Sequence, residues 1–413
     1  MINLPFKKIL LSNAPIEVIE YDKNQNDLYK TEVQDNGYCL VLNSSNVTSH
    51  GFDFEKTCFI TKEIDESLTK GKLKRGDIVL ITQNCSENNL GNVGFYDENI
   101  EYENIRINSK MVILRTKDNL LSKFLYYFLQ TNYFKKVVNT YKHVGYINPV
   151  LPLSSFKDIE FYLPTLSQQK DIVEFISLFD KKIEIYKKIN DNLENQIKTI
   201  FNSFFVFYDN YSKDELKECK IGLCPKQWNL VSLEKVTTEI KEKAGNNEYK
   251  LLSFNNCGNL ILSEDYEKQD FNNHVDKIVV KQKEFIYDSY RIHRGVIRRN
   301  NYDVEGCIDS RYIAFKVEDD YENFMEMYFK SNIFNQWIDI LPFYSGRRTL
   351  HYHEFSLIKI AYPPKRIINK FNKIYKKYYE VITHNTCVIN NLRKTKNTLL
   401  PKLISGEITI SRD

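Results

Sequence analysis

The sequence predicts an α+β protein in which two α/β domains, arranged as a tandem repeat, are separated by a pair of long antiparallel coiled-coil helices. Two long stretches carry the same apolar heptad pattern, and each follows a stretch of globular composition. The two globular stretches also share short segments in the same order, which is typical of a duplicated unit. We therefore expect four segments, at residues 1–163, 164–208, 209–362 and 363–413.

The first predicted helix follows Pro164, and no Gly or Pro occurs from Thr165 to Ile221 to interrupt it. Its apolar positions alternate in steps of four and three, the period of a helix that packs along another helix. Asn190 is a polar interruption of the kind that fixes register. The positions are Ile172, Ile176, Phe179, Ile183, Tyr186, Asn190, Leu193, Ile197, Ile200 and Phe204.

The second predicted helix repeats this pattern 199 residues later, after Pro363 and Pro364, and we expect Pro401 to end it. About 36–40 residues of helix would be about 54–60 Å long. If the two helices pair antiparallel, an approximate two-fold relates the two domains. The repeated positions are Phe371, Tyr375, Tyr378, Ile382, Asn385, Ile389, Leu392, Lys396 and Leu399.

Length and composition narrow the class of protein. A chain of 413 residues exceeds the usual size of one core, so at least two domains are expected. The net charge of +4 means that any basic surface must be local or shared with a partner. The eight cysteines are scattered, so we expect no metal site and a reducing, cytoplasmic setting. We also expect no signal peptide and no membrane-spanning segment.

In residues 1–163, a turn at Lys74–Asp77 precedes a predicted strand at Ile78–Ile81. A second strand is predicted at Met111–Leu114 and an amphipathic helix at Leu120–Val138. A loop that carries charge, aromatic rings and one glycine follows at Tyr141–Tyr146.

Residues 209–362 repeat the same order. The segment Lys281–Tyr287 replaces the turn and first strand, and Gly306–Phe315 is predicted as strand. Tyr328–Phe334 matches the helix residues 128–134, and Phe343–Arg348 replaces the glycine-containing loop. Collinear matches of this kind indicate duplication.

Catalytic motifs are missing from the pattern. The segment Tyr362–Lys365 has two prolines but lacks the acidic or amide residue and the aromatic residue of an adenine or cytosine methyltransferase motif. We interpret it as the start of a helix. No phosphate-binding GxxxxGK[ST] loop occurs. His351 and His353 are expected on one strand face without further metal ligands.

Basic and aromatic loop residues are the candidates for binding DNA. Arginine can bind guanine bidentately, and asparagine or glutamine can bind adenine. Lysine and arginine also neutralise phosphates without reading sequence. Any single one of these residues can equally be a solvated surface charge. The candidates are Lys72, Lys74, Arg75, Gln83, Asn84, Lys142, His143 and Tyr146 in the first domain, and Arg291, His293, Arg294, Arg298, Arg299, Tyr344, Arg347, Arg348 and His351 in the second.

The chain resembles the DNA-specificity subunits of type I restriction–modification systems, over essentially its whole length. The motifs with the highest specificity lie at the helices: LPTLSQQKDI at 163–172, NDNLENQ at 190–196, YPPKRIINKFNKI at 362–374 and NTLLPKLISGEI at 397–408. Weaker matches lie in the domains: KRGDIVL at 74–80, PKQW at 225–228, YRIHRGVIRRN at 290–300 and GCIDSRYIAFK at 306–316.

The resemblance implies that two target-recognition domains each read one half of a bipartite site in double-stranded DNA, with the helix pair as a ruler between them. It also implies two methyltransferase subunits that transfer a methyl group from S-adenosylmethionine to adenine N6. Two restriction subunits, using ATP and Mg²⁺, can join them. This chain itself would bind no cofactor and catalyse nothing.

Two other classes stay open at this point. One is a self-contained modification enzyme, which the missing cofactor and catalytic motifs disfavour. The other is a coiled-coil spacer or interaction protein without DNA specificity, which the helix pair alone would also fit.

Overall fold

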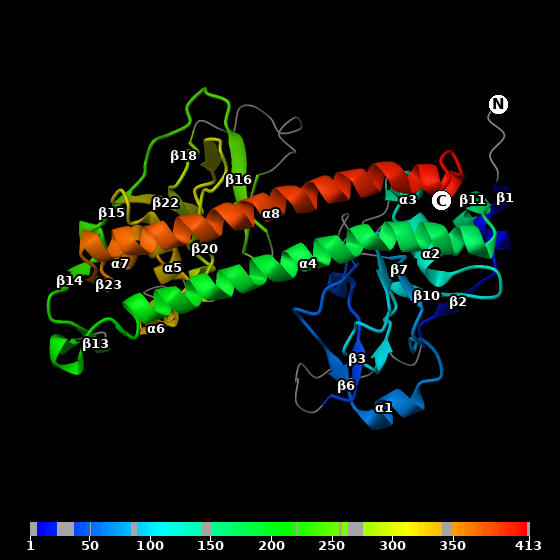
Figure 1. Ribbon diagram of the computed structural model, residues 1–413, viewed down its shortest axis with the longest axis horizontal. Helices are drawn as coiled ribbons and strands as arrows, with labels where there is room; N and C mark the ends of the chain where they lie inside the picture. The colour runs from blue at the N-terminus through cyan, green and yellow to red at the C-terminus, as the bar shows by residue number, and fades with distance from the viewer. Residues whose placement is uncertain are drawn as a thin grey trace. The chain divides into compact units, whose positions relative to one another are not determined.

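The computed structural model describes residues 6–22, 37–49, 51–83, 89–142, 150–219, 222–255, 258–262, 276–340 and 349–410. Two helices dominate it, α4 at Leu166–Phe205 and α8 at Lys365–Ser405 (Figure 1). The chain divides into two units: Met1–Lys187 together with Thr386–Asp413, and Lys188–Asn385. Each unit therefore contains one domain and a part of each long helix.

Helix α4 begins where Thr165 caps it. The Thr165 hydroxyl accepts a hydrogen bond from the backbone N–H of Gln168 at 3.4 Å, and the Gln168 side chain accepts one from the N–H of Thr165 at 3.0 Å. This reciprocal pair is a capping box, which satisfies amides that a helix start leaves free.

Helix α8 begins directly after Pro363 and Pro364, as predicted, but the prediction that Pro401 ends it is wrong. The helix continues to Ser405 and ends before Gly406, which has φ +79°. A proline removes a single amide donor, and so close to the helix end its neighbours keep the helical conformation.

In each unit the beginning of one long helix packs against the end of the other, which makes the pairing antiparallel. In the first unit, Ile172 and Ile176 of α4 share a core with Leu400, Leu403 and Ile404 of α8. The same core contains the aromatic residues of the first domain, so the helices and the domain stabilise each other.

In the second unit, α4 turns Phe201 and Phe205 into the core, where they meet Phe371 and Tyr375 of α8. The heptad pattern selected Ile200 and Phe204, which are partly buried and pack against this core, whereas the fully buried positions are Phe201 and Phe205. A straight α-helix repeats every 3.6 residues, so a strict 3.5-residue pattern drifts from the buried face along a long helix.

Further apolar and polar positions of the pattern lie along the helices at varying depth. Asn190 bonds across the pair, since its side-chain oxygen accepts a hydrogen bond from the side-chain amide of Asn385 at 2.8 Å. The buried positions are Ile183, Ile197, Ile389 and Asn385. The partly buried positions are Phe179, Tyr186, Asn190, Leu193, Tyr378, Ile382, Leu392 and Leu399.

The first domain is built on a four-stranded antiparallel sheet of order β2-β10-β7-β8. Its strands β7 and β10 confirm the two strands predicted at 78–81 and 111–114. The four strands are Ile16–Glu20, Met111–Thr116, Ile78–Ile81 and Val93–Phe95, in sheet order.

Smaller sheets complete the first domain, in the orders β1-β11, β6-β3-β9 and β4-β5. Helix α1 spans Lys62–Ser67. The strands in these orders are Lys7–Leu10, Glu160–Leu163, Phe59–Ile60, Cys39–Val41, Ile105–Arg106, Val47–Thr48 and Gly51–Phe52.

The second domain repeats this plan with a sheet of order β15-β22-β19-β20, which matches β2-β10-β7-β8 strand for strand. These strands are Thr237–Glu239, Tyr312–Val317, Phe285–Asp288 and Ile297–Arg299. The strand predicted over Gly306–Phe315 is two strands, β21 at Gly306–Ile308 and β22, because a turn intervenes. The prediction of a tandem α+β repeat is confirmed.

The remaining strands of the second unit form sheets β12-β13, β14-β23 and β17-β16-β21-β18. Helix α7 follows at Tyr352–Ser356. The strands in these orders are Leu216–Cys219, Gly222–Pro225, Asn229–Ser232, Lys359–Tyr362, Leu260–Leu262, Lys250–Phe254, Gly306–Ile308 and Ile278–Val280.

The helix predicted over Leu120–Val138 is two helices, α2 at Ser122–Leu129 and α3 at Asn132–Lys142. The Thr131 hydroxyl donates to the carbonyl of Phe128 at 2.7 Å and accepts from the N–H of Phe134 at 3.3 Å. A side-chain hydroxyl that bonds the backbone locally ends one helix and caps the next.

The same break occurs in the second unit, between α5 at Glu322–Phe329 and α6 at Asn332–Ile340. There Ser331 donates to the carbonyl of Tyr328 at 2.6 Å and accepts from the N–H of Phe334 at 3.4 Å. A hydroxyl in the same role at both positions is further evidence that the two domains are copies.

Candidate nucleic-acid interface

Several candidate DNA contacts lie outside the described residues. They are Asn84, His143, Tyr146, Tyr344, Arg347 and Arg348, and the side chain of Lys142. Their role stays a prediction. The other candidates have defined surroundings, and these separate exposed side chains from those that are used inside the fold.

In the first domain, the turn before β7 is held by Asp77, which is 1% exposed. Its carboxylate accepts the N–H of Lys74 at 2.7 Å and binds the Arg115 guanidinium through two bonds of 2.8 and 2.7 Å. Gly76 occupies the turn with φ +90°, a conformation that favours glycine. This arrangement leaves Lys74 exposed at the surface.

Arg75, in contrast, folds back onto its own domain. Its guanidinium lies 4.2 Å from the centre of the Tyr96 ring and donates to the carbonyl of Ile100 at 2.9 Å. It also donates to the carbonyl of Asp97. The side chain is engaged although its residue is exposed, so DNA would have to share or displace these contacts.

Lys72 is also engaged, by the buried carboxylate of Asp65 at 2.5 Å. Asp65 additionally pairs with Arg106, and both of these residues are buried. Burial opposes ionisation of Asp65, but the hydrogen bonds from Lys72 and Arg106 outweigh burial and lower the pKa of its carboxyl group. The group holds α1 onto β9, since Arg106 also donates to the carbonyls of Asp65 and Leu68.

In the second domain, Arg291 pairs with Asp288 at 2.8 Å and donates to the carbonyl of Asn255 at 3.1 Å. The adjacent Tyr290 is 48% exposed. Arg294 is exposed, and its guanidinium donates to His293 at 3.3 Å. The left-handed Gly295, with φ +68°, ends this short helical turn.

Arg298 is half-buried and bonds only backbone carbonyls, those of Gly295 at 2.9 Å and Ile297 at 2.8 Å. Burial lowers the pKa of its guanidinium. It lines a cleft of about 840 Å³ that lies wholly in the second unit, together with residues of α4, α5 and α8.

Arg299 is not the solvent-facing cation that the sequence suggested, since it is 8% exposed. Its guanidinium lies 2.8 Å from the Glu326 carboxylate and also bonds Asn301 at 2.7 Å and Asn323 at 2.8 Å. Strand residues alternate between the two faces, so the neighbouring arginines 298 and 299 point in opposite directions.

His351 and His353 do not lie on a strand, and that prediction is wrong. His351 is the N-terminal cap residue of α7 and His353 lies within that helix. Both residues are exposed. Among the described residues, no group of three or more His, Cys, Asp or Glu side chains is arranged to hold a metal ion.

Four of the described candidates are exposed and form no ion pair within the described ranges. They are Lys74 and Gln83 in the first domain, and Arg294 and His351 in the second. The described candidates for DNA binding thus divide into these exposed residues and into paired residues that stabilise the loops.

Sequence interpretation missed the carboxylates that fix the candidate cations. Two of them could have been recognised, because Asp77 and Asp288 stand three residues from Lys74 and Arg291 in short turns. The Asp65–Arg106 and Arg299–Glu326 pairs join residues that are far apart in the chain, and no local pattern predicts them.

Comparison with known proteins supports a DNA-related role for this architecture. The family model described as "Type I restriction modification DNA specificity domain" matches residues 16–195, which covers most of the first domain and most of α4. The MjaIX specificity subunit of Methanocaldococcus jannaschii is 25% identical over 325 residues, 71% of each chain. The chain is therefore similar to the DNA-specificity subunits of type I restriction–modification systems. The resemblance predicted from the helix motifs is confirmed.

Other type I specificity subunits match a smaller part of the chain. The HindI specificity subunit of Haemophilus influenzae is 24% identical over 179 residues, 42% of this chain and 37% of that protein. A solved type I S subunit from M. genitalium overlays with a TM-score of 0.47 and 15% identity, covering 98% of this chain and 97% of that one. No helix in the described ranges is long and apolar enough to span a bilayer.

Proposed function

We propose that this chain is the DNA-reading, non-catalytic subunit of a type I methyltransferase complex, and that each domain reads one half of a bipartite site. The observation that carries the proposal is the duplication. Two domains with the same strand order are each followed directly by a long helix, at β11–α4 and at β23–α8. A duplicated reader attached to a rigid element suits two half-sites at a fixed separation.

Within each domain, the exposed polar residues at the ends of the four-stranded sheet are the proposed readers. Lys74 and Gln83 flank β7, and Arg294 precedes β20. Glutamine can bind adenine and arginine can bind guanine in the major groove, whereas lysine supplies a phosphate contact. The buried aspartates beneath them hold the turns in one conformation, so less entropy is lost on binding.

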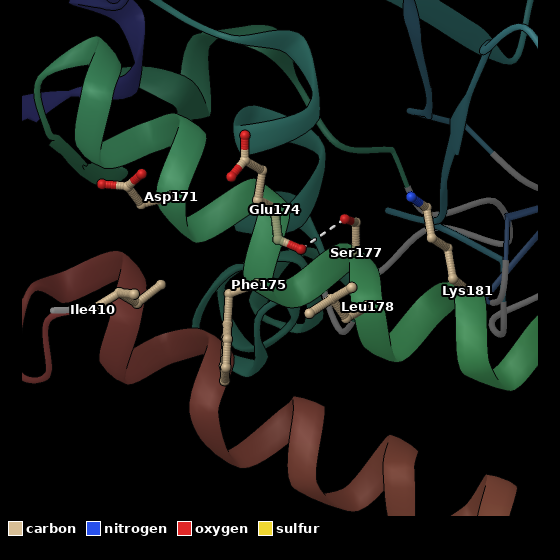
Figure 2. A pocket seen from close by; sticks show the side chains of 7 residues that line it. All are labelled: Asp171, Glu174, Phe175, Ser177, Leu178, Lys181 and Ile410. Atoms are coloured by element: carbon tan, nitrogen blue, oxygen red, sulfur yellow. Dashed lines mark hydrogen bonds between the residues drawn. The ribbon is translucent and has the colours of Figure 1, made fainter. Parts of the chain in front are cut away.

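The long helices supply a surface for partner subunits. Leu178 and Ile185 of α4 lie one heptad apart and are 55% and 56% exposed. Leu178 lines an open cleft of about 440 Å³ together with Phe175 and Ile410 (Figure 2). Apolar side chains at this exposure on one helix face are typical of a protein contact, and we assign them to the methyltransferase subunits.

The chemistry of this proposal lies on the partners. Two methyltransferase subunits would carry S-adenosylmethionine and methylate adenine N6, and restriction subunits would use ATP and Mg²⁺. The present chain would determine which DNA sequence is methylated. A set of exposed readers without a nucleophile or a cofactor loop in the sequence fits that division of labour.

The test is to co-express the chain with the methyltransferase encoded beside it and to map N6-methyladenine over the host DNA. We expect a two-part motif, with a fixed unread spacer, methylated on both strands. Deleting either domain should change one half of the motif only. Co-purification of the two proteins without any methylated motif would contradict the proposal and favour a spacer protein.

A further inference from the structure

A cleft of about 640 Å³ lies within the first unit, between the domain and the parts of α4 and α8 that belong to this unit. Six lysine or arginine residues and three aspartate or glutamate residues line it, a net charge of +3. The whole chain carries a net charge of only +4. Positive charge is therefore concentrated at this cleft. Its cations are Lys123, Lys135, Lys181, Lys187, Arg393 and Lys396.

One of these cations is already neutralised at the bottom of the cleft. Lys396 is 8% exposed and pairs with Asp180 at 2.6 Å, while its ammonium lies 4.8 Å from the centre of the Tyr127 ring. Burial lowers the pKa of Lys396, Asp180 opposes this effect, and repulsion from Lys123 and Lys135 adds to it.

The other five cations form no ion pair within the described part of the chain. Lys135, Lys181 and Lys187 are exposed, and Lys123 and Arg393 are half-buried. Figure 2 shows Lys181 pointing away from Phe175, the side chain that α4 directs toward α8. The cleft thus has a neutral floor and a charged rim.

The equivalent cleft of the second unit differs in this respect. It is lined by matching elements, but Arg299 and Lys330 on its wall both pair with Glu326, at 2.8 and 2.9 Å. Three of the six charged residues that line it form this cluster, which joins β20 to α5 through the Arg299–Glu326 pair. Duplication alone therefore does not explain the unpaired cations of the first cleft.

We infer that the rim of the first cleft binds the sugar–phosphate backbone of DNA beside the first half-site, through Lys181, Lys187 and Arg393. This inference rests on the proposed function. An unread spacer permits only sequence-independent contacts, and a lysine ammonium is a point charge that suits a phosphate in any sequence. Lys181 and Lys187 are six residues, or about 9 Å, apart along α4. That distance spans two to three nucleotides of one strand at about 3.4 Å each.

The position of the charge favours DNA over an acidic protein segment. An inserted acidic side chain would need an unpaired cation at the floor, and the floor cation is Lys396, which Asp180 already neutralises. A convex polyanion such as duplex DNA reaches the rim first, where the unpaired lysines lie.

The experiment uses the complex of this chain with its methyltransferase and a duplex of arbitrary sequence, titrated over a range of salt concentrations. The variant combines Lys181→Gln, Lys187→Gln and Arg393→Gln. Each lost phosphate contact lowers the slope of log K against log salt by about 0.9, so we expect a slope smaller by about 2.7. The methylated motif should stay unchanged.

The matched control combines Lys170→Gln, Lys182→Gln and Lys394→Gln, which removes the same charge from exposed positions of the same helices outside the cleft. Its slope should equal that of the wild type. An equal change in both variants, or no change in the cleft variant, overturns the inference. Loss of the methyltransferase with an unchanged slope also overturns it and assigns the cleft to protein. The duplex needs no recognition motif. These outcomes therefore show whether the cleft binds DNA even if the complex methylates no bipartite site.

Discussion

Replacing Arg299 by alanine tests whether this residue reads DNA or stabilises the second unit. In the structure its guanidinium lies 2.8 Å from Glu326, and both side chains are less than 10% exposed, at 7% and 9%. Arg299→Ala leaves a buried carboxylate with only Lys330 at 2.9 Å and the Tyr375 hydroxyl at 3.2 Å. We expect the free energy of unfolding to fall by about 3–5 kcal/mol, the usual cost of removing one member of a buried ion pair.

The assay is urea unfolding of the full chain, followed by tryptophan fluorescence. Both tryptophans of the sequence, Trp228 and Trp337, belong to the second unit, so the signal reports on this unit alone. With an m-value of about 2 kcal/mol per molar, the midpoint should fall by about 1.5–2.5 M urea. Glu326→Ala should have a similar effect, although it removes no candidate DNA contact.

Arg294→Ala is the matched control, because Arg294 is exposed and forms no ion pair among the described residues. Its unfolding free energy should stay within about 0.5 kcal/mol of the wild type. The combined change Arg299→Met with Glu326→Leu should recover most of the loss, since it leaves no unpaired charge. If Arg299→Ala unfolds like Arg294→Ala and still weakens DNA binding, Arg299 contacts DNA and the structural argument is wrong.

Three further changes have defined outcomes. Asn190→Leu removes the partner of the buried Asn385 and should destabilise the helix pair by about 1–3 kcal/mol, measured by urea unfolding; no loss would show that the pair does not stabilise the register. Asp65→Asn should remove an acid-dependent part of the stability. The folded-state pKa of Asp65 is lowered by Lys72 and Arg106, so its contribution is present above the unfolded value of about 3.9 and is lost as pH falls through the folded pKa. Circular dichroism between pH 2 and 7 measures this, and identical acid unfolding of wild type and variant would refute it. Inserting four residues into α4 adds about 6 Å of helix, so methylation mapping should show a longer spacer and unchanged half-sites. Changed half-sites would mean that the helices are not the ruler.

The long helices could be predicted from the sequence because their information is local. Prolines precede their starts, no Gly or Pro interrupts most of their length, and the apolar period is regular. The helix predictions were wrong where a single residue determines the local structure and the apolar period does not. Thr131 divides an amphipathic helix through one hydroxyl, and the last turns of α8 tolerate Pro401.

The candidate interface was less predictable, because residue type does not determine exposure. Arg298 and Arg299 are adjacent and chemically identical, and both line the same cleft, but of the two only Arg299 forms an ion pair among the described residues. What distinguishes them is the face of β20 and a glutamate on α5, a contact between residues 27 positions apart. Basic composition therefore selected loops that carry cations, but it did not distinguish the exposed side chains from those paired inside the fold.

In each domain a strand near its start pairs with the strand that closes it. In the first domain Lys7 of β1 stands opposite Leu163 of β11, and in the second Asn229 of β14 stands opposite Tyr362 of β23. The two ends of each domain therefore meet in one two-stranded sheet, directly before the start of a long helix. Recombination between related genes could exchange a segment bounded in this way as one unit. Both points of exchange would then lie in the same pair of strands, and the sequence of the long helix would not change. Inheritance of a new specificity would then need two crossovers, and the exchanged segment would have to keep the residues that share a core with the long helices.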